Sequence, residues 1–222
     1  MKYYLDLFNQ YFNQQLINED INVKYVLLNN GKRFRPMLTI GWCLSAGGKV
    51  EDALPLAAAI ECIHTMSLIQ DDLPCMDNAT ERRGQMCLHL KTNEANAILI
   101  SDYLFQLAYK FILHSSLSNS NKITALNILT TAISDTIVGQ QYELSTEITT
   151  IEDYLSLHKQ KTAALLTAAC KFGIIAADKE QLLNQAHIFG ESLGIGYQIY
   201  DDIQDSDGIT TITDEKSIKF LL

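Results

Sequence analysis

The sequence predicts an all-α fold, a helical bundle with a cavity between two aspartate-rich helix ends. Apolar residues recur with helical spacing along the whole chain, and strand signals are almost absent. Two long apolar segments each close in a cluster of aspartates, around residues 71 and 201. The breaks at Gly47-Gly48, Ser115 to Asn121 and Asp207-Gly208 are too short to be domain linkers. We therefore expect a single domain over residues 1–222.

The apolar spacing also sets the expected elements. At 222 residues and 47% hydrophobic, the chain can bury one substantial core. In an all-helical bundle, a binding site forms between facing helices. We expect helices at about residues 3–17, 21–30, 35–46, 51–73, 93–115, 121–146, 151–173 and 178–206, with a short one near the end.

The composition argues against several classes of protein. A net charge of -9 lacks the basic footprint of a nucleic-acid-binding protein. The N-terminus carries Asp6 and has no basic region followed by an apolar stretch, so it does not read as a signal peptide. The richest apolar window, Thr162 to Ala177, is interrupted by Lys171, so we expect no transmembrane segment. The five cysteines form no CxxC pair, which predicts free thiols and a cytoplasmic location.

The first aspartate cluster closes the apolar segment that begins near residue 54. His64 and Asp71 lie seven residues apart and share one helical face. Pro74 cannot continue the helix, so the chain should turn there and bring Asp77 back towards Asp71 and Asp72. Acidic residues beside a proline more often only end a helix in water. This cluster alone therefore does not predict a site.

A second cluster and nearby cations favour a metal and phosphate site. Asp201 and Asp205 are four residues apart and face the same way, with Gln198 one turn earlier. Arg82-Arg83-Gly84 directly follows the first cluster. Hard oxygen ligands without His or Cys indicate Mg²⁺, which prefers carboxylates, water and substrate phosphates. Carboxylates, Mg²⁺ and arginines together predict diphosphate binding.

With these motifs in view, the sequence resembles the trans-prenyl diphosphate synthases, or polyprenyl synthetases, of the short-chain farnesyl and geranylgeranyl type. Each motif is a weak signal alone, but six in the family's order are a strong one. The resemblance covers most of the chain and implies the isoprenoid-synthase type of helical bundle. The matching segments are Gly31 to Pro36, Asp71 to Asp77, Arg82 to Gly84, Gly139-Gln140, Lys161-Thr162 and Gln198 to Asp205.

The resemblance also implies a role for each matching residue. Isopentenyl diphosphate would bind to Lys32, Arg35, His64 and Arg83, although a lone histidine is more often an ordinary, partly buried one. The allylic diphosphate would bind to Arg82 and Lys161, and Thr162 and Gln198 would stabilise the allylic cation. Asp71, Asp72, Lys161, Thr162 and Gln198 form the implied catalytic set. Up to three Mg²⁺ ions would bind Asp71, Asp72, Asp77, Asp201 and Asp202, with Asp205 reaching metal through water.

The implied reaction is a head-to-tail condensation. Isopentenyl diphosphate would join dimethylallyl, geranyl or farnesyl diphosphate and give farnesyl or geranylgeranyl diphosphate. Met66 and Ser67, one turn before Asp71, would form the floor that limits product length. The resemblance further implies a homodimer, with the apolar helices near residues 93–146 as its interface.

Several departures from the family pattern leave a second reading open. Asn78 to Glu81 replace the family's aspartates, and Glu143 stands where Asp is usual. The chain ends soon after the second cluster, so we expect the family's last helices to be absent, with Lys216 or Lys219 supplying a late charge. The alternative is a catalytically weak or inactive family member that acts as a binding or regulatory subunit. A terpene cyclase is disfavoured, because it would not need the isopentenyl-binding cations.

Overall fold

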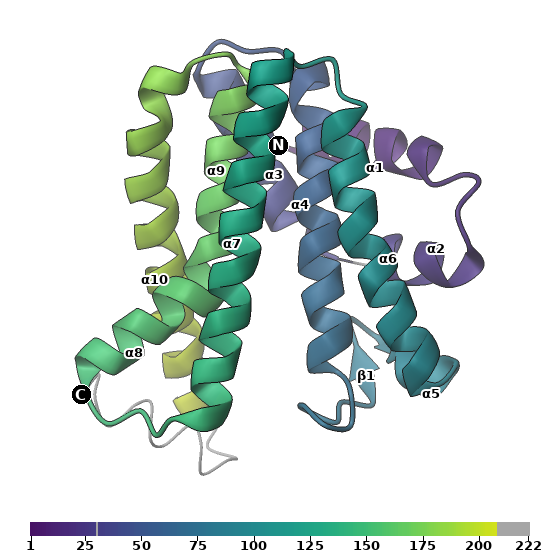
Figure 1. Cartoon of the computed structure of the whole chain (residues 1–222), viewed down its shortest axis with the longest axis vertical. Helices are drawn as coiled ribbons and strands as arrows, with labels where there is room; N and C mark the ends of the chain where they lie inside the picture. The colour runs from purple at the N-terminus through teal and green to yellow at the C-terminus, as the bar shows by residue number, and fades with distance from the viewer. Residues whose placement is uncertain (30, 208–222) are drawn as a thin grey trace.

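The computed structural model describes residues 1–29 and 31–207, and its described part is a bundle of helices (Figure 1). The predicted all-α fold is confirmed. The short final helix, Lys216 and Lys219 of the sequence analysis lie outside the described residues. The α-helices are α1 (Lys2–Gln15), α2 (Ile21–Leu27), α3 (Phe34–Ser45), α4 (Val50–Asp71), α5 (Leu88–Lys91), α6 (Glu94–Leu113), α7 (Asn119–Ser145), α8 (Ile151–His158), α9 (Ala164–Ala176) and α10 (Leu183–Asp207).

Two apolar helices form the centre of the bundle. The helix α4 packs against α3, α6 and α9, and α9 packs in turn against α3, α7 and α10. Every residue from 53 to 63 of α4 is buried, and every residue of α9 from 165 to 176 is buried except Lys171. The length and apolar character of α4 would also suit a membrane span, but 78% of its most apolar 18-residue stretch is buried inside the protein. Burial of this kind is expected of the core helix of a globular domain.

Helix starts follow local capping chemistry. The side chains of Asn93 and Ser118 accept hydrogen bonds from backbone N–H groups in the first turns of α6 and α7. Thr150 and Asp153 form a reciprocal capping box at the start of α8. These polar residues satisfy backbone donors that have no partner within the helix, and so they set where the apolar segments begin.

The two acidic helix ends lie at the same end of the bundle. Both α4 and α10 run downward in Figure 1, so their C-terminal ends lie in the lower part of the view, where α8 crosses beside α10. The helix α9 packs against both α4 and α10, which places the two acid-bearing helices on either side of it. All five cysteines are free thiols, as predicted.

Candidate active site

The two acidic helix ends face one cavity of about 690 Å³. Asp71 comes from the end of α4 and Asp201 from the end of α10, and both line this cavity. Apolar side chains also line it, among them Ile63, Ile133 and Leu165. Eight more residues with predicted roles line the same space: Arg35, His64, Met66, Ser67, Arg82, Lys161, Thr162 and Gln198.

The first acidic end turns back on itself as the proline predicts. The backbone N–H of Asp77 donates to the carbonyl of Asp71 at 2.8 Å, which returns Asp77 to the helix end. Asp72 is 4% exposed and accepts from Arg82 Nε at 2.7 Å, with Nη2 of the same arginine at 2.6 Å. The other carboxylate, Asp77, is exposed and lies 3.9 Å from Arg82 Nη2. Asp71 therefore faces the cavity while Asp72 is held by a cation.

A short hairpin that the sequence analysis did not predict positions the two arginines. Strand β1 (Glu81–Arg82) pairs with β2 (Gln85–Met86), and Arg83 and Gly84 make the turn with φ values of 56° and 77°. Such a turn needs positive φ at both central residues, which glycine adopts readily. The hairpin directs Arg82 to Asp72 and Arg83 to Glu61. Two-residue strands are too short to give a periodic signal.

A second, smaller hollow of about 360 Å³ gathers positive charge. Of the predicted residues, Lys32, Arg35, His64 and Arg83 line it. Burial, followed by the neighbouring arginines, holds the pKa of His64 well below its usual range, so the imidazole is neutral at neutral pH. Burial lowers the pKa of Arg35 to about 10, which still leaves it charged. The hollow thus combines several cations with one neutral histidine.

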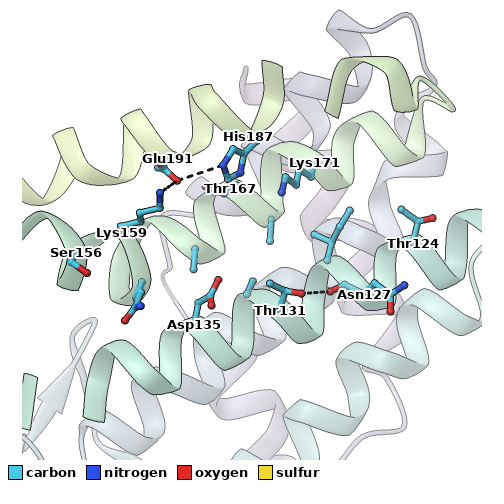
Figure 2. Close-up of a pocket in the computed structure, with 15 residues that line it drawn as sticks. Thr124, Asn127, Thr131, Asp135, Ser156, Lys159, Thr167, Lys171, His187 and Glu191 are labelled. Carbon is cyan, nitrogen blue, oxygen red and sulfur yellow. Dashed lines mark hydrogen bonds and ion pairs between the residues drawn. The ribbon is translucent and has the colours of Figure 1, made fainter. Parts of the chain in front are cut away.

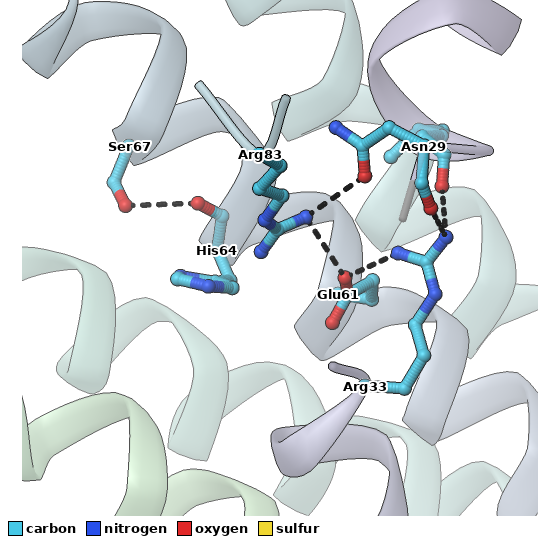
Figure 3. A network of polar contacts seen from close by, with 7 residues as sticks. Asn29, Arg33, Glu61, His64, Ser67 and Arg83 are labelled. Carbon is cyan, nitrogen blue, oxygen red and sulfur yellow. Dashed lines mark hydrogen bonds and ion pairs between the residues drawn. The ribbon is translucent and has the colours of Figure 1, made fainter. Parts of the chain in front are cut away.

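A buried carboxylate organises these cations. Glu61 is 1% exposed and contacts Arg33 Nη1 at 2.5 Å and Arg83 Nη1 at 3.7 Å, as Figure 3 shows. Arg33 is 5% exposed, has a φ of 54°, and also donates to the carbonyls of Leu27 and Asn29 at 2.6 and 3.0 Å. Neither residue has a role in the sequence analysis. A glutamate inside an apolar helix is a usable signal, because buried charges need partners.

Arg35, His64 and Tyr197 line both hollows. The Tyr197 ring stacks on Phe34, with centroids 6.2 Å apart. The Nε of Arg35 is buried, and no hydrogen-bond partner for it lies among the described residues. The cationic hollow and the acidic cavity are therefore adjacent and share a polar wall.

The second acidic end is held by neutral donors. Asp202 accepts from the hydroxyl of Tyr154 at 2.5 Å and from Nε2 of Gln198 at 2.8 Å. The Oε1 of Gln198 accepts from the hydroxyl of Thr162 at 2.9 Å. Asp202 is not among the described residues that line the main cavity, whereas Asp201 is. The side chain of Asp205 lies outside the described part of the structure.

A π-helical segment, Lys159–Ala163, presents Lys161 and Thr162 to the cavity. The sequence predicted one continuous helix over residues 151–173, and the wider turns interrupt it. Two glycines let neighbouring helices approach this segment: a Cβ at Gly139 would lie 2.6 Å from the backbone N of Lys161, and one at Gly194 would lie 2.4 Å from Ala163. Lys161 Nζ pairs with Glu143 of α7. Insertions of this kind often occur at functional sites.

Comparisons with known proteins agree with this geometry. The sequence profile of the Polyprenyl synthetase family matches residues 18–217. The chain belongs to this family. It is 38% identical over 200 residues to the farnesyl diphosphate synthase of Micrococcus luteus, covering 88% of this chain and 68% of the relative. It is 40% identical over 192 residues to the geranylgeranyl diphosphate synthase of Cyanophora paradoxa, covering 83% of this chain and 64% of the relative.

Solved structures of polyprenyl synthetases show the same fold. The Helicobacter pylori geranyltransferase complexed with magnesium and isoprenyl diphosphate aligns with a TM-score of 0.79 and 30% identity. That alignment covers 97% of this chain and 78% of the other. This chain spans 64–68% of the length of the two curated relatives named above.

The donor chemistry fits the magnesium that the family implies. Among the described residues, no group of three His, Cys, Asp or Glu side chains is gathered closely enough to hold a metal ion by itself. Mg²⁺, however, takes one or two protein carboxylates and completes its shell with water and phosphate oxygens. Burial raises the pKa of Asp71 to about 6, and a bound cation would stabilise its ionised form. Asp71 and Asp201 could hold such an ion together with a diphosphate.

The predicted floor residues lie at the wall of the cavity in this polyprenyl synthetase. Met66 is 5% exposed, and both Met66 and Ser67 line the space. The hydroxyl of Ser67 donates to the carbonyl of His64 at 3.0 Å and is thereby turned towards its own helix. Of these two residues, Met66 therefore supplies the apolar bulk.

Another hollow, of about 430 Å³, lies between α7, α9 and α10, and none of the predicted site residues lines it. Its lysines are matched by carboxylates: Lys159, Lys171, Asp135 and Glu191 all line it, and Figure 2 shows Glu191 in contact with Lys159 Nζ at 3.0 Å and His187 Nε2 at 3.5 Å. It therefore lacks the concentrated positive charge of the hollow around Arg35 and Arg83.

Proposed function

We propose that this chain is a prenyltransferase that condenses isopentenyl diphosphate with an allylic diphosphate to give farnesyl or geranylgeranyl diphosphate. One observation carries the proposal: Asp71 and Asp201, from different helices, line a single apolar-walled cavity next to a hollow lined by Lys32, Arg35 and Arg83. A carboxylate-lined mouth suits a diphosphate that arrives with divalent cations, whereas the cationic hollow suits one that binds directly.

The proposed roles follow from the position of each residue. Lys32, Arg35 and Arg83 would bind the isopentenyl diphosphate, with the neutral His64 as a further hydrogen-bonding partner. Arg82 and Lys161 would contact the allylic diphosphate at the cavity mouth. Asp71, Asp77 and Asp201 would hold Mg²⁺ ions. When bound with the diphosphate, these ions supply positive charge that stabilises the leaving group.

The rest of the cavity would protect the allylic cation. The walls formed by Ile63, Ile133 and Leu165 exclude water from the reacting carbons. The hydroxyl of Thr162 donates to Gln198, so its lone pairs are free to face the cation. Attack by the isopentenyl double bond and loss of a proton then complete the condensation. The proton acceptor is the departing diphosphate in this scheme.

The proposed assembly is a homodimer formed through α6 and α7. Leu99 on α6 and Ile123 and Val138 on α7 are 65%, 60% and 49% exposed. Large apolar side chains on long helices suit a self-complementary interface. Light scattering of the purified protein would give its mass, and Leu99→Asp is expected to shift it towards the monomer. A monomeric parent protein would contradict this assembly.

The activity is tested by incubating purified protein with Mg²⁺, labelled isopentenyl diphosphate, and dimethylallyl, geranyl or farnesyl diphosphate in turn. The expected result is an allylic diphosphate longer by one five-carbon unit, and none with an Asp71→Asn, Asp201→Asn double variant. Binding of both substrates without turnover would overturn the proposal and support the binding-subunit alternative. A cyclic hydrocarbon without isopentenyl label would instead indicate a cyclase.

A further inference from the structure

A chain of hydrogen bonds ties three separate elements together behind the second acidic end. It runs from Tyr154 on α8 to Asp202 and Gln198 on α10, and from there to Thr162 on the π-helical segment. Tyr154 is 1% exposed, and its ring packs against His158 with centroids 4.3 Å apart. No role in the sequence analysis was given to Tyr154.

The chemistry of each group fixes the direction of this chain. An ionised carboxylate can only accept hydrogen bonds, so both Tyr154 and Gln198 must donate to Asp202. The amide of Gln198 must then turn its Nε2 towards Asp202 and its Oε1 towards Thr162. Because Oε1 also can only accept, the hydroxyl of Thr162 must donate to it. The hydroxyl proton of Thr162 therefore points away from the cavity that Thr162 lines.

We propose that Tyr154 and Asp202 are positioning residues that fix the hydroxyl of Thr162 as an acceptor facing the cavity, and that Asp202 serves this purpose instead of binding metal. Both carboxylate oxygens of Asp202 already accept from protein donors, and Asp202 does not line the main cavity, whereas Asp201 does. The hydrogen-bond geometry stands by itself. Its catalytic consequence rests on the proposed prenyltransferase function, because the oriented lone pairs would stabilise an allylic cation.

Asp202→Asn tests the direction of the chain. An asparagine amide would accept from Tyr154 through its oxygen and donate through its nitrogen to Oε1 of Gln198. The Gln198 amide would turn over, its Nε2 would donate to Thr162, and the threonine proton would be released towards the cavity. Tyr154→Phe keeps the ring but removes one donor, so it weakens the chain without reversing it.

The matched control for metal binding is Asp201→Asn, the same substitution one position earlier. Calorimetry with MgCl₂ and inorganic diphosphate measures binding without turnover. Asp201→Asn is expected to weaken this binding by about 10-fold or more, and Asp202→Asn by less than about twofold. Equal losses in the two variants would overturn the proposal and make Asp202 a ligand. If the parent protein binds no diphosphate with Mg²⁺, the proposed function fails while the positioning proposal is still tested by spectroscopy.

Spectroscopy reads the orientation directly. The side-chain amide of Gln198 can be assigned in ¹⁵N-labelled protein by its loss in Gln198→Glu. Its resonance is expected to shift strongly in Asp202→Asn, and by less in Tyr154→Phe, while circular dichroism checks that each variant is folded. An unshifted Gln198 amide in a folded Asp202→Asn protein would overturn the proposal.

Kinetics gives the functional result. Asp202→Asn is expected to lower kcat by about 10-fold to 100-fold, the range for removal of a preorganised dipole, with the KM for isopentenyl diphosphate changed by less than about threefold. Tyr154→Phe should show the same pattern with a smaller loss. A change confined to KM, or an unchanged kcat in Asp202→Asn, would contradict the proposed role.

Discussion

The two acidic helix ends differ in how each holds its second aspartate. At the end of α4, Asp72 is paired with the guanidinium of Arg82. At the end of α10, Asp202 is held by the neutral donors of Tyr154 and Gln198. The first aspartate of each pair, Asp71 or Asp201, lines the shared cavity. In each Asp-Asp pair, therefore, the first residue lines the cavity and the second is bound by side chains of the protein.

The difference in partner has a chemical consequence. Arg82 lines the cavity as well as pairing with Asp72, so an arriving diphosphate can share it. Tyr154 and Gln198 both donate to Asp202, and Gln198 in turn accepts from Thr162. The first end is thus suited to capturing the diphosphate, and the second end to fixing the groups around the hydrocarbon.

The largest expected effect is loss of activity when either cavity-facing aspartate is neutralised. Asp71→Asn and Asp201→Asn should each lower kcat/KM by at least about 100-fold, because each removes charge that would hold the leaving group with Mg²⁺. Chelating the divalent ions in the parent protein should have the same effect. Steady-state assays measure both. Comparable activity in Asp201→Asn and the parent protein would break the proposed symmetry of the two ends.

Stability measurements separate the charged partner from the neutral one. Arg82→Ala leaves the buried Asp72 without a cation and should lower the free energy of unfolding by about 2–3 kcal/mol, less than for a fully buried pair because Arg82 is 36% exposed. Tyr154→Phe should lower it by about 1–2 kcal/mol. Urea denaturation gives both values. Added 1 M NaCl should shrink only the Arg82 effect, because salt screens charges more than it weakens a buried neutral hydrogen bond. If salt changed the effects of Arg82→Ala and Tyr154→Phe equally, the two aspartates would not differ in the charge of their partners.

The pH dependence of the free energy of unfolding, measured without added metal or substrate, reports on Asp71. Burial raises the pKa of this carboxyl to about 6, above its value in the unfolded chain. Its contribution to stability is therefore greatest below pH 4 and falls as the pH rises through 6. Asp71→Asn should be more stable than the parent at pH 8 by about 1–2 kcal/mol, after allowance for solvent screening, with the difference vanishing near pH 4. If the parent protein is instead more stable than Asp71→Asn at pH 8, the pKa of Asp71 is not raised by burial.

The smallest expected effect is on product length. The wall below Asp71 is apolar through Met66, whereas the turn before Asp201 presents Tyr197 and Gln198. Met66→Ala should enlarge the cavity and lengthen the products by about one five-carbon unit. The matched control, Met37→Ala, changes a partly buried methionine on α3 that lines neither the cavity nor the cationic hollow, and it should leave chain length unchanged. Mass spectrometry of the products compares the two, and an unchanged profile in Met66→Ala would count against this floor.

Local sequence signals predicted most of the helices and, together with the family resemblance, many of the residues that line the cavity. The spacing of His64 and Asp71, and the turn at Pro74, follow from helix geometry and proline chemistry, and the structure has both. The tertiary partners could not be predicted in this way. Tyr154 lies 48 residues before Asp202, and no local pattern connects them. The partners of Asp72 and Asp202 therefore became visible only in the three-dimensional structure.

The remaining differences also have physical causes. The hairpin at Arg83-Gly84 has strands of two residues, below the length at which alternation is visible. The π-helical turn at Lys161 depends on close packing against Gly139 and Gly194, which is a property of the assembled bundle. Glu61 carried a detectable signal, since a carboxylate in an apolar helix requires a buried partner.

The most direct test of the whole account is a double-mutant cycle on Mg²⁺-dependent diphosphate binding. Calorimetry would compare the parent protein with Asp71→Asn, Asp201→Asn and the double variant. If the two helix ends share one ligand across the cavity, each single change should weaken binding by about 10-fold or more, and the double variant should lose much less than the product of the two. Two independent, fully multiplicative losses, or no loss in either single variant, would show that Asp71 and Asp201 do not act on a common diphosphate.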